Sequence, residues 1–462
     1  MDGLARDPAS FRDPDGAVHD DGIQVLRTLS ERSAHDWARL RDTQFFRAAL
    51  EEGRLVATEE ASAETVPSSV SDGWALTLRH ERLPFVSYPY EWTFSMLQDA
   101  ALIHLELLSA ALNEGFSMKD GSAFNVQFKG STPIFIDLGS FEPSVGPWAG
   151  YRQFCQTLLY PLLLAAHRGI DFRPLLRGRI EGIEPDQMQR LVGFRDRLRP
   201  GVFKHVVLHA AMAGRMTERS ARTKAELQEA GFGADLTAAL ARGLRKTVKK
   251  LVYRPPRSHW SDYHQIAIYG EDDRAAKETF VRQAVPARTG LVLDLGCNDG
   301  TYSVLIADAA EYVVAVDSDP VVVDRLYRLL RANGPANVLP LVIDLADPSP
   351  GMGWRGRERP SFCDRARPEA VLALALVHHL AIGASVPLDE VVAWLRSFDA
   401  RVVAEFPLPG DPFVERLMAN KPTGTHTDYT LETFERAVAS RFAVRRRQAL
   451  PCGSRILFEL TP

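Results

Sequence analysis

Residues 291–300 read LVLDLGCNDG, and this decapeptide constrains the fold more than any other part of the chain. An apolar run that carries Asp294 leads into a glycine-containing turn at 296–300, and a second apolar run ends at Asp317. A glycine turn after one strand, with an acid closing the next strand about 20 residues on, is typical of α/β sheets that bind an adenine nucleoside. Glycine lets the backbone approach the ligand, and the acid can accept from both ribose hydroxyls. The decapeptide therefore predicts a strand–turn–helix unit at a ligand-binding sheet edge.

The composition of the turn distinguishes between nucleoside ligands. A dinucleotide-binding turn needs a third glycine for close helix packing, and Thr301 stands at that position, which disfavours a nicotinamide oxidoreductase. Asp294, two residues before the first glycine, can meet a cationic, amine-bearing ligand. The stretch resembles motif I of the class I S-adenosylmethionine-dependent methyltransferases, an acid followed by Gly-x-Gly-x-Gly. Asn298 replaces the middle glycine, and Asn is the other residue that best tolerates a positive φ.

The region after the turn predicts an α/β fold built on a Rossmann-like, seven-stranded sheet with its last strand antiparallel. Further apolar strands are expected at 338–343, 370–376 and 401–404, and a terminal hairpin at 442–449 and 455–460. Open α/β sheets bind ligands at the carboxyl ends of their strands. The polar residues expected there are Asp294, Asp317, Asp344, His378, His379 and Glu405.

The resemblance implies a role for each residue at this edge. Asp317 would bind the ribose and Asp344 the adenine amino group of S-adenosylmethionine. The methionine part would lie against Asp294, Gly296, Asn298 and Gly300. His378 and His379 follow the fourth strand, where a histidine with a pKa near 6.5 can take a proton from an acceptor hydroxyl. Which histidine acts stays open, since a structural hydrogen bond explains either one alone, and Glu405 is a weaker catalytic candidate.

Composition restricts the class of protein. The chain has 462 residues, 45% of them hydrophobic, and a net charge of −4, which suits two or three globular domains. We expect one domain at 1–251 and a second at 259–462, joined by a linker at 252–258. A nucleic-acid binder would be more basic, so no nucleic-acid partner is expected. The four widely spaced cysteines fit a reducing compartment and a cytoplasmic location. The longest apolar run, 157–166, is too short for membrane insertion, and an oligomeric state is left open.

The N-terminal half contains a second motif. A long amphipathic helix pattern at 94–112 precedes Asp120, Asn125 and Asp137. These intervals resemble the catalytic and metal-binding loops of a protein kinase, with Met-Lys-Asp for His-Arg-Asp and Asp-Leu-Gly for Asp-Phe-Gly. An active site of this type would bind a nucleotide and hold magnesium through Asn125 and Asp137. However, no glycine-rich phosphate loop is evident, and Arg27 stands where the phosphate-pairing lysine would be.

Three interpretations of this half remain. It is an active kinase-like phosphotransferase, or a degenerate α+β kinase-like domain that binds substrate or nucleotide or regulates the other half. The third interpretation is that no kinase relation exists, and that Asp120 and Asp137 cap turns.

The whole chain resembles bacterial two-part methyltransferases of the nodulation-protein-like type. The residues that carry this resemblance are 260–263, 294–300, 377–380, 405–406, 428–429 and 120–139. The resemblance implies methyl transfer but little about the substrate, because such families have no fixed acceptor; our hypothesis is a small-molecule, natural-product or glycan-like acceptor. We expect O-methylation. N-methylation of a nucleobase is disfavoured, because Val-His-His follows the fourth strand in place of an Asn-Pro-Pro-Tyr clamp. The alternatives are a bifunctional phosphotransferase and methyltransferase, and a non-catalytic scaffold that binds the cofactor.

Overall fold

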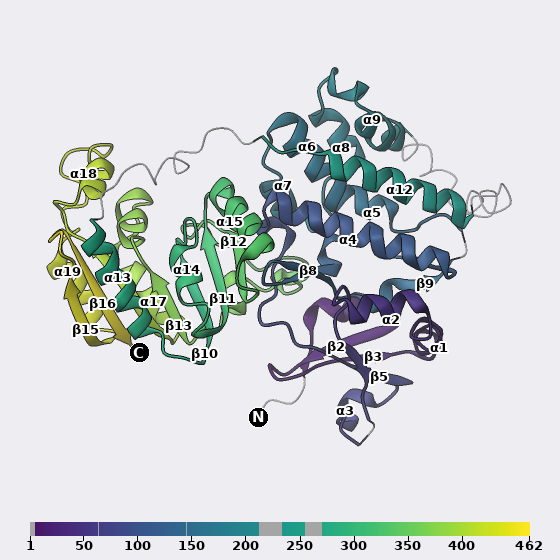
Figure 1. The fold of residues 1–462 in the computed structure, drawn as a ribbon, viewed down its shortest axis with the longest axis horizontal. Helices are drawn as coiled ribbons and strands as arrows, with labels where there is room; N and C mark the ends of the chain where they lie inside the picture. The colour runs from purple at the N-terminus through teal and green to yellow at the C-terminus, as the bar shows by residue number, and fades with distance from the viewer. Residues whose placement is uncertain (1–4, 63, 145, 212–232, 255–269) are drawn as a thin grey trace. The chain divides into compact units, whose positions relative to one another are not determined.

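The computed structural model describes residues 5–62, 64–144, 146–211, 233–254 and 270–462. The chain forms two compact units, drawn in purple to teal and in green to yellow (Figure 1). Unit 1 holds residues 1–128, 133–256 and 351–359, and unit 2 holds 129–132, 257–350 and 360–462. The main division falls inside the predicted linker. Two short segments are assigned differently from the predicted domains: 129–132 belongs to unit 2, and 351–359 belongs to unit 1.

Unit 1 begins with a five-stranded antiparallel sheet in the order β1-β2-β3-β5-β4. Two helices lie between β3 and β4 in the chain, and Ser30 caps the first by accepting from the Ser33 amide. The strands are β1 (Ala5–Arg6), β2 (Gly16–Asp20), β3 (Val25–Leu29), β4 (Thr58–Glu60) and β5 (Leu76–His80). The helices of this part are α1 (Glu31–Leu40), α2 (Gln44–Glu51) and α3 (Ser68–Ser71).

The rest of unit 1 is mainly helical around α4 (Phe94–Asn113), as the pattern at 94–112 predicted. Helix α12 (Ala234–Lys250), which carries several lysines and arginines, packs along α4. Two small two-stranded sheets pair β6 (Phe116–Met118) with β9 (Phe141–Pro143) and β7 (Val126–Lys129) with β8 (Thr132–Phe135). The other helices are α5 (Tyr151–Phe154), α6 (Tyr160–Arg168), α7 (Arg173–Gly178), α8 (Pro185–Leu191) and α9 (Pro200–Val202).

Side-chain contacts fix α12 on α4. Gln98 of α4 donates to the carbonyls of Val248 and Leu251, and Arg245 of α12 pairs with Glu106 at 2.7 Å. Part of the basic character of α12 is therefore used within the unit.

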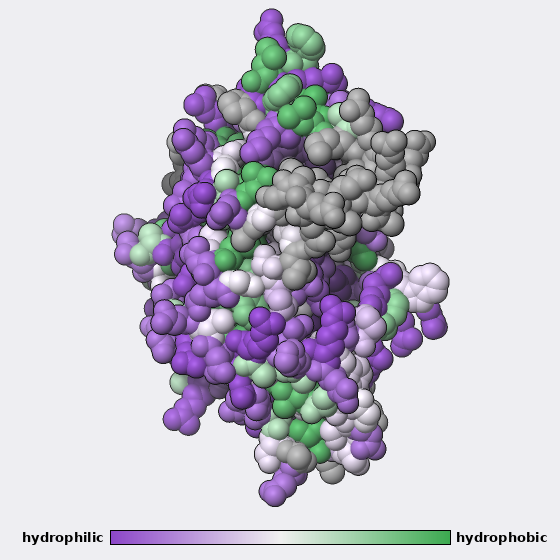
Figure 2. Space-filling model, turned by 90° about the vertical axis from the view of Figure 1, so that its right-hand side faces the viewer, coloured by the Kyte–Doolittle hydropathy of each residue, from purple (hydrophilic) through white to green (hydrophobic). Residues whose placement is uncertain are grey.

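On the face seen in Figure 2, apolar residues form small groups among hydrophilic ones. Among the described residues, no helix combines the length and apolar composition that a bilayer crossing requires.

Unit 2 is built on a seven-stranded sheet in the order β12-β11-β10-β13-β14-β16-β15. Strands β10 to β14 are parallel, and β16 runs antiparallel to both β14 and β15. The strands are β10 (Thr289–Leu295), β11 (Ala310–Asp317), β12 (Val338–Val342), β13 (Ala370–Ala373), β14 (Arg401–Pro407), β15 (Ala443–Ala449) and β16 (Arg455–Thr461). Two strand ends differ from prediction by three residues: β13 ends at Ala373, earlier than expected, and β14 continues to Pro407.

Helices cover both faces of this sheet. On one face, Phe280 and Leu326 pack with Val292 and Val313 in a single apolar cluster. On the other, the ring of Phe434 lies against aromatic rings of β14 and β16. The helices are α13 (Glu271–Ala284), α14 (Thr301–Leu305), α15 (Pro320–Asn333), α16 (Phe362–Arg365), α17 (Leu388–Ser397), α18 (Pro412–Met418) and α19 (Leu431–Ala439). The carboxyl ends of the parallel strands share one edge, where the loops can form a site.

Candidate functional site

A cavity of about 750 Å³ opens at the carboxyl ends of the parallel strands in unit 2. This volume is within the range of about 300–1,000 Å³ that is typical of small-molecule sites. Six of the residues predicted for this edge line the cavity, and they come from the ends of four different strands. They are Asp294, Gly296, Asn298, Asp317, Asp344 and His379. Three others, Gly300, His378 and Glu405, do not line it.

The turn after β10 is held in a conformation that few residues adopt. The φ angles are 80° at Gly296, 49° at Asn298 and 79° at Gly300. Asn298 therefore takes the positive φ that the sequence predicted for it. The Gly296 and Cys297 amides donate to the Val316 carbonyl at 2.8 and 2.9 Å, which ties the turn to β11.

Gly300 is needed for packing. A Cβ at this position would lie 2.5 Å from Cδ1 of Leu326 on α15, a separation that real side chains do not adopt. The last glycine of the turn therefore brings the backbone close to α15, and the first two positive-φ residues face the cavity.

Asp294 is a buried carboxylate in the cavity wall. Its Oδ2 accepts from the Ser303 hydroxyl at 2.5 Å. Burial raises the pKa of Asp294 from its ordinary value of 3.8 to about 6, against the opposing effects of the Ser303 hydrogen bond and the Lys277 charge. Such a carboxyl favours a cationic partner, because a nearby positive charge stabilises its ionised form.

Asp317 and Asp344 lie at the ends of the next two strands. Asp317 accepts from the Asn298 amide at 2.9 Å and from the Asp319 amide at 2.9 Å, and burial raises its pKa. Asp344 is exposed and accepts from the Ala346 amide at 2.9 Å. Backbone hydrogen bonds thus orient both carboxylates at the cavity.

The two histidines differ in position although their ring centroids lie 4.1 Å apart. His379 begins the π-helix 379–383 and lines the cavity, whereas His378 is fully buried beside it. Neither ring nitrogen of His378 has a hydrogen-bond partner among the described residues. Burial lowers the pKa of His379 to about 4, helped by the charge of Arg455, and burial also lowers the pKa of His378 well below its ordinary value of 6.5. The expectation of a pKa near 6.5 is therefore wrong for both rings, which are neutral at physiological pH.

Glu405 requires a correction. The sequence predicted that it follows a strand, but β14 continues to Pro407, so Glu405 lies inside the sheet and is fully buried. Its carboxylate is bound by Lys277 at 2.6 Å and by Arg455 at 3.2 Å. A carboxylate engaged by two buried cations serves to fix them, and Glu405 is not available as a catalytic base.

Sequence reasoning missed the residues that α13 and α14 contribute. Arg274, Lys277 and Tyr302 line the cavity, and the Lys277 Nζ lies 4.8 Å from the centroid of the Tyr302 ring. The available signal was an amphipathic segment directly before β10, with buried Phe280 and Val281 on the same side as Lys277. The aromatic residues at 260–263 that the sequence singled out lie outside the described residues.

Unit 1 brings the second motif together around an arginine. Arg27 on β3 pairs with Asp137 at 2.6 Å, and a Cβ on Gly139 would lie 2.9 Å from the same guanidinium. Burial and the charge of Asp137 raise the pKa of Asp120, and the side-chain nitrogen of Asn125 is buried with no hydrogen-bond partner among the described residues.

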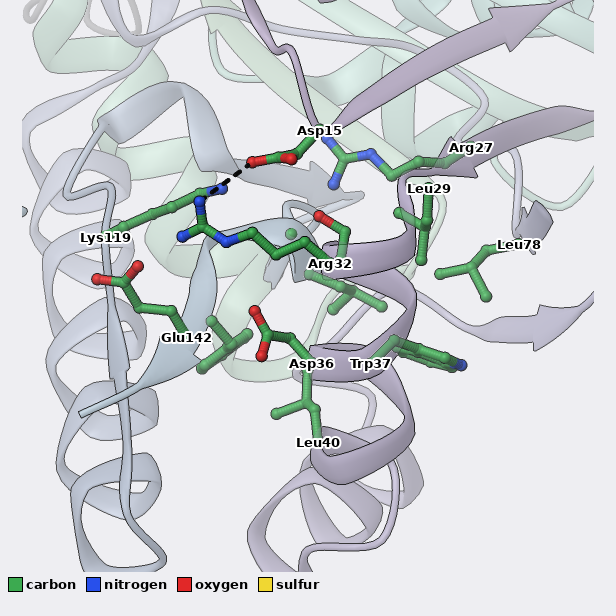
Figure 3. A pocket seen from close by; sticks show the side chains of 14 residues that line it. Asp15, Arg27, Leu29, Arg32, Asp36, Trp37, Leu40, Leu78, Lys119 and Glu142 are labelled. Atoms are coloured by element: carbon green, nitrogen blue, oxygen red, sulfur yellow. Dashed lines mark ion pairs between the residues drawn. The ribbon is translucent and has the colours of Figure 1, made fainter. Parts of the chain in front are cut away.

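A small pocket adjoins this group. Its volume is about 30 Å³, the space of about one water molecule, and Arg27, Lys119 and Gly139 line it (Figure 3). Arg32 and Asp15 form an ion pair at its rim, at 3.8 Å. Among the residues that the structure describes, no group of three or more His, Cys, Asp or Glu side chains is placed to hold a metal ion.

Asp294 makes the stability of unit 2 depend on pH. Because folding raises its pKa from 3.8 to about 6, the protonated form is favoured in the folded state, and stability is lost as the pH rises from about 4 through about 6. We expect Asp294→Asn to raise the free energy of unfolding above pH 6 by up to about 3 kcal/mol, and by little at pH 4. Urea denaturation at both pH values, with the exposed Asp308→Asn as control, measures this. An equal effect at both pH values would contradict the assignment.

No protein-family model matches the chain. The chain is 34% identical over 464 residues to the nodulation protein NoeA of Rhizobium meliloti (strain 1021). The alignment covers 97% of this chain and 94% of that protein. Among solved structures, a magnesium protoporphyrin IX methyltransferase from Synechocystis PCC 6803 with bound SAH matches with 17% identity and a TM-score of 0.30, over 44% of this chain and 94% of that one. The N-methyltransferase NodS from Bradyrhizobium japonicum WM9 matches with 9% identity and a TM-score of 0.31, over 42% and 99%. The extent of the first match shows that the chain belongs to the family of the nodulation protein NoeA.

Proposed function

We propose that this protein is an S-adenosylmethionine-dependent methyltransferase and that its active site is the cavity in unit 2. One observation supports the proposal most strongly. A single cavity collects a turn with positive φ angles, three strand-end carboxylates and a neutral imidazole. The order of these groups along the sheet edge follows the strand order.

That order matches the parts of S-adenosylmethionine. Asp344 follows β12 and would accept from the adenine amino group. Asp317 ends β11 and would accept from the ribose hydroxyls. Asp294 and the turn after β10 would hold the methionine part, whose ammonium suits a buried carboxylate. His379, after β13, would then face the acceptor.

Methyl transfer by this site would be a direct displacement. When bound, S-adenosylmethionine would supply a methyl group on a sulfonium; the acceptor oxygen would form a bond to that carbon as the carbon–sulfur bond breaks, and the sulfur would keep the electron pair. The chain's own residues align the reactants and exclude water. His379, being neutral, would take the hydroxyl proton of the acceptor.

Two features of the site support a proposal for the acceptor class. A volume of about 750 Å³ leaves space for a small molecule or a sugar-sized group beside the nucleoside. A neutral proton acceptor at the cavity wall suits a hydroxyl nucleophile, since a hydroxyl must lose its proton during methylation. We therefore propose O-methylation of a small-molecule, natural-product or glycan-like acceptor.

We further propose that unit 1 is a degenerate kinase-like domain that binds a substrate or regulates the methyltransferase. The Arg27–Asp137 pair supports this. Arginine stays charged at all relevant pH values, so its guanidinium competes with a divalent cation for the carboxylate that an active kinase would use for magnesium.

The ribose assignment is tested by Asp317→Ala. Loss of two charge-assisted hydrogen bonds should weaken binding of S-adenosylhomocysteine about 100-fold or more in calorimetry. Asp308→Ala removes an exposed carboxylate outside the cavity and should bind like the wild type. Wild-type affinity in a folded Asp317→Ala variant would refute the assignment.

We expect the two histidines to differ in function. We expect His379→Ala to bind cofactor normally and to lose about 100-fold or more in the rate of labelled-methyl transfer to a hydroxyl acceptor found by screening. In the wild type this rate should fall as the pH drops through about 4, because His379 must be neutral to take a proton. His378→Ala is the matched control. Normal turnover of His379→Ala, or a larger loss in His378→Ala, would exclude the proposed role.

The interpretation of unit 1 is tested by titrating ATP into the full-length protein with and without magnesium. Because Arg27 holds Asp137, magnesium should change the nucleotide affinity by less than about twofold, and no phosphate should be transferred. A magnesium-dependent gain of about tenfold or more, together with phosphate transfer to an acceptor, would instead establish the bifunctional alternative.

A further inference from the structure

Helix α13 brings a buried cation to the cavity. The side chain of Lys277 is only 4% exposed, yet it lines the cavity, and its Nζ lies 2.6 Å from Oε2 of Glu405. An ammonium group out of water is costly unless it is paired, so a lysine held in this place needs a counter-charge built into the fold.

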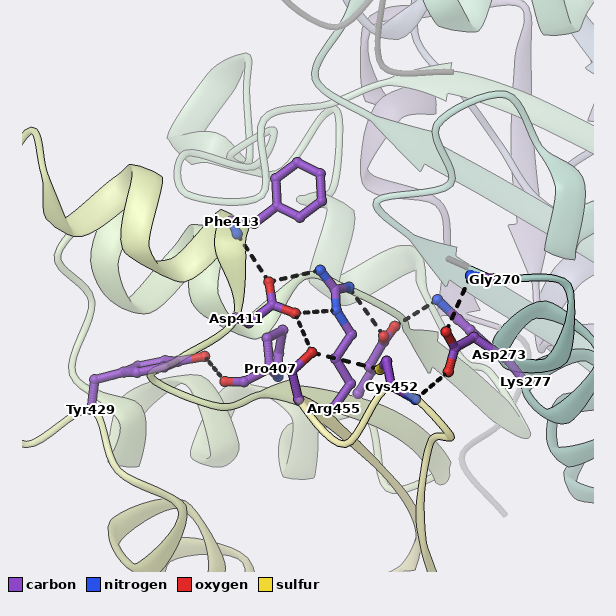
Figure 4. A network of polar contacts seen from close by, with 11 residues as sticks. Gly270, Asp273, Lys277, Pro407, Asp411, Phe413, Tyr429, Cys452 and Arg455 are labelled. Carbon is purple, nitrogen blue, oxygen red and sulfur yellow. Dashed lines mark hydrogen bonds and ion pairs between the residues drawn. The ribbon is translucent and has the colours of Figure 1, made fainter. Parts of the chain in front are cut away.

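That counter-charge belongs to a chain of four alternating charges (Figure 4). Behind Lys277, Oε1 of Glu405 accepts from Arg455 at 3.2 Å, and Arg455 binds both oxygens of Asp411 at 2.7 and 3.0 Å. Asp411 in turn caps α18 by accepting from the Phe413 amide at 3.0 Å. Two cations and two carboxylates balance, and all four side chains are buried.

Other contacts place Lys277 along the sheet edge. Glu405 belongs to β14, and the Tyr302 ring, 4.8 Å from the ammonium, comes two residues after the turn that follows β10. The positive charge of Lys277 also lowers the pKa of Asp294. Lys277 is therefore beside the turn after β10, on the side away from Asp317 and Asp344.

The charges around the cavity leave one ligand group to be accounted for. The carboxylates that line the cavity suit the amine, the diol and the ammonium of the ligand, and they would repel an anion. The methionine part of the proposed ligand carries a carboxylate next to its ammonium. Among the described residues that line the cavity, the lysine and arginine side chains are Arg274, which is exposed and screened by water, and Lys277, which is buried.

We propose that Lys277 receives the carboxylate of the methionine part of S-adenosylmethionine. Glu405, Arg455 and Asp411 act through it, as positioning residues that fix its ammonium at the cavity wall. The inference rests on the proposed methyltransferase function and adds a residue from α13 to the site.

The test compares two ligands by calorimetry on the full-length protein. One is S-adenosylhomocysteine, and the other is 5′-deoxy-5′-(3-aminopropylthio)adenosine, which lacks only the carboxylate. The wild type should bind the first at least about tenfold more tightly. Lys277→Met and Lys277→Gln should lose this preference while binding the second ligand within about threefold of the wild type.

Further variants separate charge from packing. Lys277→Arg should keep most of the preference, and Arg282→Met, which removes an exposed cation from the same helix, should keep all of it. Glu405→Asp, which draws the carboxylate back by one methylene, should reduce the preference without changing affinity for the second ligand.

Each outcome decides between the proposals. If the Lys277 variants weaken both ligands equally, or if the preference is lost in Arg274→Met instead, Lys277 does not bind the carboxylate and the methyltransferase proposal still holds. If the wild type binds neither ligand, both proposals fail together.

Discussion

The hydrogen bond from the Asn298 amide to the Asp317 carboxylate joins the turn after β10 to the end of β11. The rest of the candidate site depends on this link. It holds the turn in a conformation with positive φ, so that the backbone of the turn lines the cavity with little side-chain bulk. It also orients Asp317, whose second oxygen is bound by the Asp319 amide. The surface proposed for the nucleoside is thus fixed mainly by backbone groups.

The opposite side of the cavity is fixed by charge. Lys277, Glu405 and Arg455 are buried, and a buried ion pair is weak evidence for stability because desolvation offsets its attraction. In this site, the buried charges instead change the pKa values of neighbouring groups. The cations Arg455 and Lys277 add to burial in lowering the pKa of His378, and Arg455 does the same for His379. Burial is the larger cause, and the network adds to it in keeping the imidazoles neutral beside the cavity. A neutral imidazole can accept a proton, whereas an imidazolium would repel a sulfonium ligand.

The residues that sequence could predict are those set by local pattern. An acid at or near the end of an apolar run lies at the carboxyl edge of the sheet, and Asp294, Asp317 and Asp344 all line the cavity. Glu405 did not follow this rule because β14 is extended by pairing with β16, where Pro407 lies opposite Arg455. Strand length set by a partner more than 40 residues away leaves no local signal. Alternation then places Glu405 on the face of Val403, which packs in the cluster with α13. Lys277 could not be found from a motif, because its position depends on the docking of an ordinary amphipathic helix.

In unit 1, too, local sequence patterns predict the residues of a group but not the long-range contact that decides its chemistry. The spacing of Asp120, Asn125 and Asp137 is a local signal, and the structure brings Asp120 and Asp137 near enough for their charges to interact. The chemistry of the group is decided by Arg27, which comes from a strand 110 residues earlier in the chain. An arginine tethered to Asp137 supplies a positive charge that neither dissociates nor exchanges, whereas phosphoryl transfer requires a cation that can bridge protein and phosphate oxygens. In the degenerate kinase-like domain that we propose, the Arg27 side chain thus takes the place of the metal ion, and the carboxylates serve to bind a ligand or to hold the local structure.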